Sequence, residues 1–513
     1  MAEDYLTSRA DGLQTRLSLT YARSFVSEHR VALITVAIFV LSLIIYRLMW
    51  YLSGLEGPSV TVQNNFVRQA DAFLNGRIDM GPNGGQLESF IELAINDGKY
   101  YIIPPPMPAI IILPGVIIWG LALNQTLVSA VIGAINSGTV YNVTRSVSKR
   151  LSTQIWLTVL VGLGTVYWYT ASNGAVWFFS HTVAVLFLFL AIYFTLGRKN
   201  PLMAGLCLGA AYWTRAPAIL TFPFFLIMFS DDWLVWEKDR PLLKRINWQP
   251  LIYLCWGVGV FVLLSFVYNY LRWGTPLDAS QHHLPDRVLA QPWFNHGIFS
   301  YEYIPRHVVL FFEGTPVVRC ICATPLSEAA KSDEPYVLSN LNGSAIWMTT
   351  PAFLYALFAG WKDRRFVVLG LGLLAIAVGI PVSRSISGLW GSDWYSYQFE
   401  RHINILPFYI LIGMALWFGR KDKFVLACWA AIIPTALMLF TFAGTGFVQF
   451  GYRFQLDFMP FLFLLTAYAM GPDLRWHHKL LIVLSVLLNL WGVLWLYHFE
   501  PTHAFGIMQW SSF

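Results

Sequence analysis

The sequence predicts an all-α membrane protein that crosses the bilayer many times. Hydrophobic residues make up 56% of the 513 residues and charged residues only 12%, whereas soluble proteins average about 25% charged residues. Apolar runs close to the roughly 20 residues that a spanning helix needs recur along the chain. Clusters of Lys and Arg separate these runs, but the net charge is only +6 and no run has the basic composition of a nucleic-acid-binding segment. We therefore expect membrane lipids as partners, and no nucleic acid.

The first thirty residues differ in character from the chain that follows. Residues 1–30 form an amphipathic segment of mixed charge, without a short apolar core and a small-residue cleavage site. A secretory signal peptide needs both features, so we predict a cytoplasmic N-terminal segment. The run 31–53 is then the first span.

The remaining spans follow from the positions of the positive clusters. The apolar runs that are long enough, or nearly so, are 31–53, 125–147, 153–171, 175–196, 202–213 with 217–230, 249–271, 347–361, 366–384, 402–419, 423–443, 453–470 and 478–498. The positive clusters between them are Arg145/Lys149/Arg150, Arg198/Lys199, Lys238 to Arg245, Lys362/Arg364/Arg365, Arg420/Lys421/Lys423 and Arg475 to Lys479. Placing every cluster in the cytoplasm, as the positive-inside rule requires, makes the runs cross in alternation. The predicted transmembrane domain, 31–498, is a bundle of about 13 helices, followed by an extracytoplasmic tail at 499–513.

One apolar run would break this alternation. The stretch "YYIIPPPMPAIIILPGVIIWGLAL", residues 100–123, would invert every later loop if it crossed the membrane. It is rich in proline and no cluster of Lys and Arg flanks it, so we predict an interfacial helix along the outer surface. The first outer loop is then 54–124, and a second large outer loop is 272–346.

Another interfacial helix is predicted near the start of the first outer loop, in "NNFVRQADAFLNGRID", residues 64–79. On a helix its polar residues form one stripe: Asn64, Arg68, Asp71 and Asn75. Its apolar residues fall on the opposite side: Phe66, Ala70 and Phe73. We expect the apolar side to rest on lipid or protein, and the stripe to face water.

Three arginines are predicted at the outer ends of spans. The segment "WTRAPA", residues 213–218, interrupts two apolar runs that are too short to span comfortably, and Arg215 has no neighbouring acid there. Ionisable residues at such a depth are more often functional than decorative. Arg401 and Arg453 stand at the outer mouths of two spans, in the similar segments "YQFERHINILPFYILI" and "VQFGYRFQLDFMPFLFLL". Because guanidinium groups bind phosphate in a bidentate manner, the predicted ligand is a lipid phosphate at the outer leaflet.

The first outer loop also supplies carboxylates that could act as a general base. They are Asp71, Asp79, Glu88, Glu92 and Asp97. Phosphate-binding cations beside an external carboxylate describe a sugar transferase that uses a lipid-phosphate donor.

The cysteines indicate neither a disulfide framework nor a metal site. The five are scattered along the chain: Cys207, Cys255, Cys320, Cys322 and Cys428. Three lie within apolar runs, and the other two are too close in sequence to bridge each other readily. We expect no metal cofactor.

The order of the segments resembles a known class of membrane enzymes. A first span is followed by "FVRQADAFLNGRIDM" and "DGKYYIIPPPMPAIIILP", and then by "WYTASNGAVWFFSHT", "GLCLGAAYWTRAPAILTFPFF", "NGSAIWMTTPAFL" and "GYRFQLDFMPFLFLL". This order is similar to that of the GT-C class of polytopic glycosyltransferases, which includes protein O-mannosyltransferases and the lipid A aminoarabinose transferase. The resemblance covers most of the chain.

The resemblance implies a polyprenyl-phosphate sugar donor, an extracytoplasmic active site and a first-loop helix that forms one wall of it. The acceptor would be a hydroxyl group of a glycan, lipid or protein. In many relatives the catalytic Asp lies at or just before the first-loop helix, but "SVTVQNNF" has no carboxylate there, so Asp71 and Asp79 are the candidate bases. The expected substrate-binding residues are Arg215, Arg453, Arg401, Lys99, Tyr100 and His181.

Each of these residues also has a structural interpretation. Asp71 could pair with Arg68, Arg453 with Asp457, and Arg401 with Glu400. Asp79 and Asp97 could be turn residues, and His181 could be a packed imidazole. At the level of the whole chain, a secondary transporter or lipid flippase remains an alternative, because broken helices with charges at depth also mark transporters. An oligosaccharide polymerase or ligase would share the chemistry but concentrate its key residues in a late outer loop.

Overall fold

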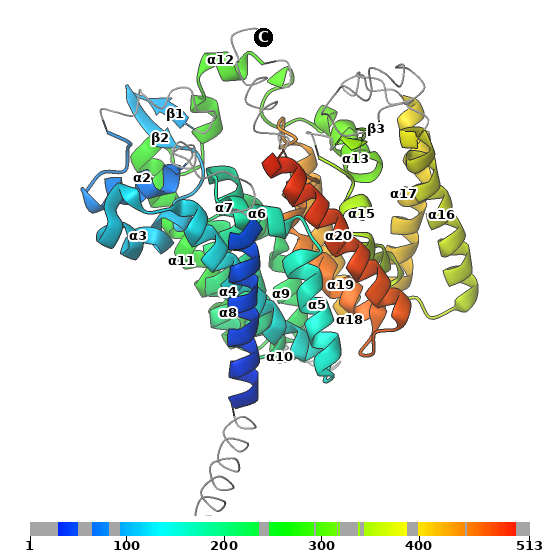
Figure 1. Ribbon diagram of the computed structural model, residues 1–513. Helices are drawn as coiled ribbons and strands as arrows, with labels where there is room; N and C mark the ends of the chain where they lie inside the picture. Colours follow the sequence, from blue (N-terminus) through cyan, green and yellow to red (C-terminus); the bar gives the residue numbers. More distant parts are fainter. Residues whose placement is uncertain are drawn as a thin grey trace, which may run out of the picture.

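The computed structural model describes residues 29–49, 64–81, 93–234, 246–291, 294–314, 317–318, 337–338, 343–386, 399–446 and 449–498. Most of them are helical and form a bundle of long helices (Figure 1). Within these ranges six helices are long and apolar enough to cross a membrane: His29–Met49, α7 (Val176–Leu196), α11 (Trp248–Trp273), Arg364–Ser383 of α16, α18 (Lys423–Phe440) and Trp476–Trp495 of α20. A seventh is reached if α5 (Leu151–Leu163) and α6 (Tyr167–Asn173), which meet at 58°, form one broken span. The all-α membrane character is confirmed, whereas the predicted number of about 13 spans is not.

Several predicted spans are shorter or more broken than expected. Helix α4 (Gln125–Val147) has the predicted bounds, and α8 (Pro201–Tyr212), η4 (Ala216–Thr221) and α9 (Phe222–Met228) form the predicted broken pair. The run 347–361, in contrast, consists of α15 (Ile346–Thr349) and the 3₁₀ helix η9 (Pro351–Phe358). The run 453–470 consists of η10 (Arg453–Asp457) and α19 (Met459–Met470). Both η9 and α19 have a proline in their first turn. Proline is tolerated there because the N–H that it lacks would have no partner within the helix, but it cannot continue a helix that precedes it.

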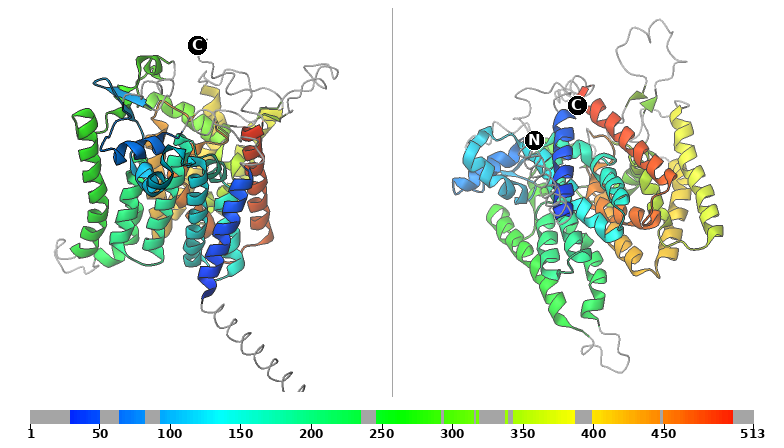
Figure 2. Two further views of the ribbon diagram at one scale, coloured as in Figure 1. Left: turned by 60° about the vertical axis from the view of Figure 1, so that its left-hand side comes forward. Right: turned by 60° about the horizontal axis from the view of Figure 1, so that its bottom comes forward.

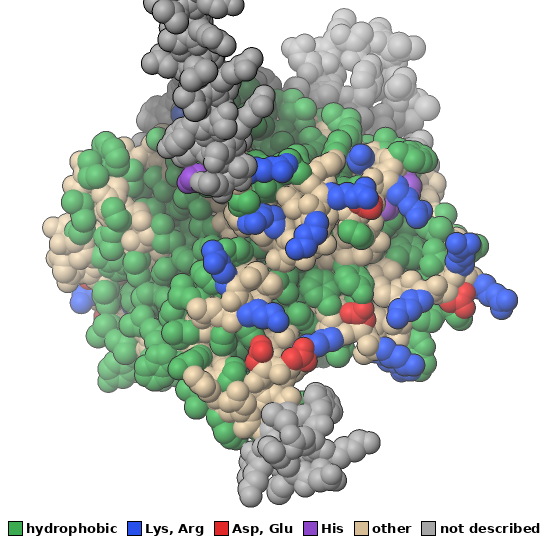
Figure 3. Space-filling view, turned by 90° about the horizontal axis from the view of Figure 1, so that it is seen from below, with side chains coloured by type: hydrophobic (Ala, Val, Ile, Leu, Met, Phe, Trp, Pro, Cys, Tyr) green, Lys and Arg blue, Asp and Glu red, His purple; other side chains and the backbone are tan. Residues whose placement is uncertain are grey.

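The Lys and Arg clusters that the structure describes gather at one end of the bundle, here called the basic end; the cluster Lys238 to Arg245 lies outside the described residues. Figure 3 looks at this end and shows many basic and few acidic side chains. Two ion pairs at this end join helix ends that are far apart in sequence: Arg150 pairs with Asp473, and Lys423 Nζ lies 2.7 Å from Asp231 Oδ2. The clustering agrees with the positive-inside pattern from which the spans were predicted.

The opposite end, here called the loop end, carries the short elements. These are α2 (Asn65–Leu74), the strands β1 (Leu93–Asn96) and β2 (Lys99–Ile102), α3 (Met107–Trp119), α12 (Asp286–Leu289) and α13 (Ile304–Glu313). Helices α2 and α3 pack on each other and lie across the long helices near this end (Figures 1 and 2).

The predicted interfacial helix at 100–123 is only partly helical. Strands β1 and β2 pair antiparallel with Asn96 opposite Lys99, and α3 begins only after the prolines at 104–106. Asp97 has φ 49° and Gly98 has φ 72°, the positive values that a two-residue hairpin turn needs. Asp97 therefore has the turn position that its composition suggested, and the tyrosines beside it favour a strand.

Helices α8 and α11 pack unusually close because glycines line their contact. Gly205 and Gly209 are one turn apart on α8 and face Gly257 on α11. A Cβ atom on Gly257 would lie 2.5 Å from the Leu206 backbone nitrogen. Small residues at this spacing let helix backbones approach in membrane proteins. This contact fixes the loop-end termini of both helices, which carry residues of the candidate site.

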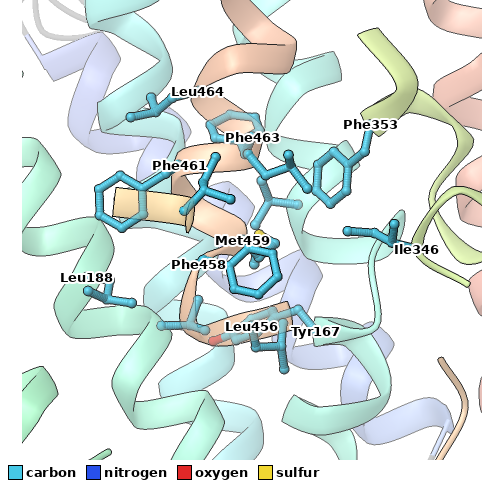
Figure 4. Close-up of a cluster of buried hydrophobic side chains, with 14 of the residues drawn as sticks. Tyr167, Leu188, Ile346, Phe353, Leu456, Phe458, Met459, Phe461, Phe463 and Leu464 are labelled. Carbon is cyan, nitrogen blue, oxygen red and sulfur yellow. The ribbon is translucent and has the colours of Figure 1, made fainter. Parts of the chain in front are cut away.

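Helix α19 occupies the centre of the hydrophobic core. Its residues are buried almost all round, as expected for a helix that is apolar on every face. Figure 4 shows side chains of η10 and α19 packed among those of α6, α7, α15 and η9. The core therefore holds η10, which precedes α19 at the loop end, in a fixed position.

Candidate functional site

The centre of the candidate site is an ion pair between segments that are far apart in sequence. Arg215 Nε donates to Asp457 Oδ1 at 2.6 Å, and Nη2 donates to Oδ2 at 2.8 Å. The Asp457 side chain is 1% exposed and that of Arg215 is 18% exposed. The expectation that no acid neutralises Arg215 was wrong, because the core brings η10 against the break between α8 and η4. The acid stands 242 residues away and could not be found from neighbours in sequence.

His181 and Arg453 complete the group, which we call the arginine cluster: Phe178, His181, Arg215, Arg453, Phe454 and Asp457. His181 is fully buried on α7, with Nδ1 3.4 Å from Asp457 Oδ1. The guanidinium carbons of Arg453 and Arg215 lie 5.5 Å and 5.8 Å from the centroid of the same Phe454 ring. Two cations thus meet over one aromatic ring, and the cation–π contacts help to hold them in place. The ion pair that the structure shows at Asp457 is with Arg215, in place of the alternative pair Arg453–Asp457.

The backbone before Arg453 is held by tight local packing. Gly451 has φ 72°, and a Cβ atom there would lie 2.5 Å from Val166 Cγ1. The Arg453 N–H donates to Gln449 Oε1 at 3.1 Å. On α13, the His307 ring bonds Tyr452 Oη through Nδ1 at 2.9 Å and the Phe442 carbonyl through Nε2 at 2.8 Å. These bonds fix the chain that presents the arginine.

Helix α2 has the predicted amphipathic arrangement, and its apolar side rests on protein. Phe66, Val67 and Ala70 are buried against α3 and α7. Asp71 is half-buried, and among the residues that the structure describes no ion pair or hydrogen bond engages its carboxylate. The alternative pair with Arg68 is therefore not formed within the described part of the chain. Asp71 keeps an available carboxylate, as a general base requires.

The other candidate base and two predicted binding residues lie around the hairpin. Asp79 Oδ1 accepts a hydrogen bond from the Gly81 N–H at 2.8 Å, which is the alternative turn role. Lys99 is exposed at the start of β2, and the Tyr100 carbonyl accepts from the Met80 N–H at 2.8 Å. Burial, and then the Asp79 carboxylate, raises the pKa of Tyr101. These residues belong to the hairpin and to the loop before it, whereas the arginine cluster is carried by α7, η10 and the break before η4.

A buried arginine that the sequence did not single out lies under this hairpin. Arg272, at the end of α11, is 3% exposed. Its Nη1 donates to the Ile102 carbonyl at 3.0 Å and its Nη2 to Asn269 Oδ1 at 2.8 Å. Its guanidinium carbon lies 4.2 Å from the Tyr268 ring centroid. An arginine directly after a long apolar run was the available signal, because such residues are costly at that depth unless they have partners.

Arg272 also lines a small, partly open cavity of about 30 Å³. Its walls come from the loop before α3, the end of α8, the end of α11 and the segment that follows α11: Pro105, Pro106, Tyr212, Trp213, Ala216, Ser265, Tyr268, Asn269, Arg272 and Asp278. On one side, Tyr268 receives a hydrogen bond from Gln69 Nε2 of α2 at 2.9 Å. On another side, Ala216 directly follows Arg215. The cavity therefore lies between the helix of Asp71 and the arginine cluster.

The structure brings together Arg215, Arg453 and His181. Arg401 belongs to α17 (Phe399–Gly419), which packs mainly against α16 (Arg364–Ile386) and α13; its side chain and that of Glu400 lie outside the described residues. Glu88, Glu92, Cys320 and Cys322 also fall outside them. Among the described residues, Cys207, Cys255 and Cys428 are free thiols, and no group of three or more His, Cys, Asp or Glu side chains could hold a metal ion.

Comparisons of the chain with protein-family models, curated proteins and solved structures find no match.

Proposed function

We propose that this protein is an integral-membrane glycosyltransferase that moves a sugar from a polyprenyl-phosphate donor to an acceptor hydroxyl on the extracytoplasmic face. The observation that carries the proposal is the meeting of two arginines, from distant segments, at the end of the bundle that also holds α2. Asp457 occupies Nε and Nη2 of Arg215 but leaves Nη1, which bonds no described residue. The Arg215 guanidinium is thus held in place by Asp457 through two of its nitrogens, while its third nitrogen is available to bind an oxyanion.

The charge distribution supports an extracytoplasmic site. The basic end would face the cytoplasm by the positive-inside rule, which places the loop end, with α2 and the arginine cluster, outside. Lipid-linked sugars would approach the cluster from the outer leaflet. The short helices that lie across the bundle would cover the reacting groups.

The proposed reaction is a single displacement with inversion. Asp71 takes the proton of the acceptor hydroxyl, whose oxygen attacks the anomeric carbon of the donor while the bond to the phosphate oxygen breaks. The leaving phosphate gains negative charge as this bond breaks, and Arg215 and Arg453 stabilise that charge. Asp457 keeps Arg215 in place, and the mechanism needs no metal ion to balance the charge.

The decisive experiment incubates the purified full-length protein with a panel of radiolabelled polyprenyl-phosphate sugars and candidate acceptors. Release of polyprenyl phosphate together with a labelled product supports the proposal. Arg453→Lys keeps the positive charge but loses the planar fork, so it should weaken donor binding. Transfer at the wild-type rate with wild-type donor affinity in this variant would contradict the assignment of the arginine.

Topology can be tested independently of activity. A cysteine introduced at Lys99, on the exposed hairpin, should react with an impermeant thiol reagent from outside the cell. A cysteine at Lys421, on the basic end, should react only after the membrane is opened. Labelling of both from the same side would refute the assignment of the two ends.

A transporter or lipid flippase is the second candidate, because the structure contains broken helices beside a buried ion pair. Helices α5 and α6 meet at 58°, and α8 is separated from α9 by a break at Arg215 and the 3₁₀ helix η4. Such breaks often form substrate sites in transporters. Uptake of a labelled lipid or sugar into proteoliposomes, without cleavage of any donor, would favour this function over transfer.

A further inference from the structure

The cavity beside Arg272 has more hydrogen-bond donors than the protein itself uses. Arg272 Nε and Trp213 Nε1 are buried and have no acceptor among the described residues. The Tyr268 hydroxyl accepts from Gln69, and its own proton has no acceptor in the described part of the chain. Buried N–H and O–H groups usually find an acceptor, so three such donors around one cavity indicate a polar ligand.

Acceptors line the same cavity. The Asp278 Oδ1 atom lies 3.9 Å from Arg272 Nη2, and the Ser265 hydroxyl is also part of the wall. A phosphate dianion would lie close to the Asp278 carboxylate, whose negative charge would repel it. Hydroxyl groups both donate and accept, so they match a wall that offers both kinds of partner.

The aromatic side chains of the wall narrow the ligand class further. Tyr212, Trp213 and Tyr268 contribute aromatic side chains to the same wall as the polar groups. The volume of about 30 Å³ has room for about two water molecules or one small polar group, but not for a whole ring. A sugar could place an exocyclic hydroxyl in the cavity while its ring rests on the aromatic side chains at the opening.

We infer that this cavity is the acceptor subsite and that the acceptor is itself a carbohydrate. The inference rests on the proposed transferase function, because it uses the position of the cavity between the helix of Asp71 and the segment of Arg215. Tyr268 joins the cavity to α2 through Gln69 and through the edge-on Phe73 ring, whose centroid is 6.4 Å away. An acceptor sugar held there would have the candidate base on one side and the candidate donor phosphate site on the other.

The test measures sugar binding without any donor. Full-length protein in detergent is titrated with a panel of methyl hexopyranosides and methyl pentopyranosides, and binding is followed by saturation-transfer NMR and calorimetry. Two control probes are used. Inorganic phosphate is charged and lacks the pattern of neutral hydroxyl groups, and cyclohexylmethanol has a ring with a single hydroxyl group. We expect at least one glycoside to bind, and neither of the two control probes to compete with it.

Two variants locate the binding. Ala216→Leu fills the cavity and should raise the Kd of the glycoside at least about tenfold. Trp213→Phe keeps an aromatic side chain but loses the indole N–H donor, and it should raise the Kd roughly fivefold. Leu271→Phe is the matched control, because Leu271 lies on α11 but is 59% exposed, and it should leave the Kd unchanged. If Ala216→Leu does not fold, Trp213→Phe carries the test.

The two proposals fail in different ways. No glycoside binding, competition by phosphate, or an unchanged Kd in the folded variants would overturn the acceptor subsite. Glycoside binding that is lost in the variants, with no transfer from any donor, would retain the sugar site and reject the transferase. Transfer whose acceptor KM is unaffected by the variants would retain the transferase and reject this subsite.

Discussion

Replacing Asp457 by alanine removes the carboxylate that holds Arg215 and leaves a largely buried guanidinium without it. Two charge-assisted hydrogen bonds, at 2.6 and 2.8 Å, are lost, and each such bond contributes about 1.5–3 kcal/mol. The sum agrees with the roughly 3–5 kcal/mol that breaking a buried ion pair costs. We therefore expect Asp457→Ala to lower the free energy of unfolding by about 4 kcal/mol.

The same pair can be replaced without that cost if both charges are removed together. Arg215→Met with Asp457→Leu substitutes apolar side chains of similar size, and such exchanges are commonly neutral within about 1 kcal/mol or stabilising. The double variant should therefore be more stable than either single variant. If the arginine cluster binds the donor phosphate, the double variant should nevertheless be folded and inactive.

Unfolding temperature in a single detergent is a suitable assay, followed by the fluorescence of the 22 tryptophans. An unfolding entropy of about 2.1 cal/mol/K per residue gives about 1.1 kcal/mol/K for the whole chain, so 4 kcal/mol corresponds to about 4 °C. Scan rate is kept constant because large proteins often unfold irreversibly. A wild-type unfolding temperature in Asp457→Ala, or a double variant less stable than both single variants, would refute the reasoning.

Three further predictions test other parts of the structure. Asp71→Asn should reduce turnover by about 10² to 10⁴ while donor binding persists, and Asn75→Ala on the same stripe should not; comparable single-turnover rates for both variants would exclude Asp71 as the base. Gly257→Val should separate α8 from α11 and lower stability by roughly 1–3 kcal/mol, whereas Gly259→Val, with open space around its Cβ position, should be tolerated in the same thermal assay. Burial lowers the pKa of His307 from 6.5 to about 3, so its contribution to stability is complete above about pH 6.5 and declines as the pH falls towards 3. Unfolding temperatures from pH 7 to pH 4 should therefore fall less steeply in His307→Gln, and an equal slope would contradict this assignment.

Sequence patterns predicted those features that depend on neighbouring residues. The amphipathic period of residues 64–79 correctly indicated that Phe66 and Ala70 pack inward, and the pair Asp97 and Gly98 correctly indicated a turn. The bounds of α4 and the break at Arg215 also follow from local composition. Each of these features is decided by spacing along a helix or by the φ angles that a residue tolerates.

Features decided by packing between distant segments could not be predicted in this way. The run 347–361 has nearly enough apolar residues for a span, but its segment Pro351–Phe358 is the 3₁₀ helix η9, which packs against α19. Hydropathy reports how apolar a run is, and not whether its helix is regular. The strand at Lys99–Ile102 likewise depends on its partner, β1, and on the aromatic contact of Tyr101 with Trp273 at 5.2 Å.

The arginines show most clearly what local sequence leaves open. Arg215 and Arg453 stand out in the sequence because charges near apolar runs are rare, but the same signal applies equally to Arg401 and Arg272. Tertiary packing gives Arg215 and Arg272 different surroundings: Arg215 bonds Asp457, and Arg272 supports the hairpin through the Ile102 carbonyl. A buried guanidinium needs hydrogen-bond or ion-pair partners wherever it lies in the protein. An arginine near an apolar run therefore predicts that such partners exist. Only the fold determines whether protein groups bond all of its N–H groups or leave some of them available to a ligand.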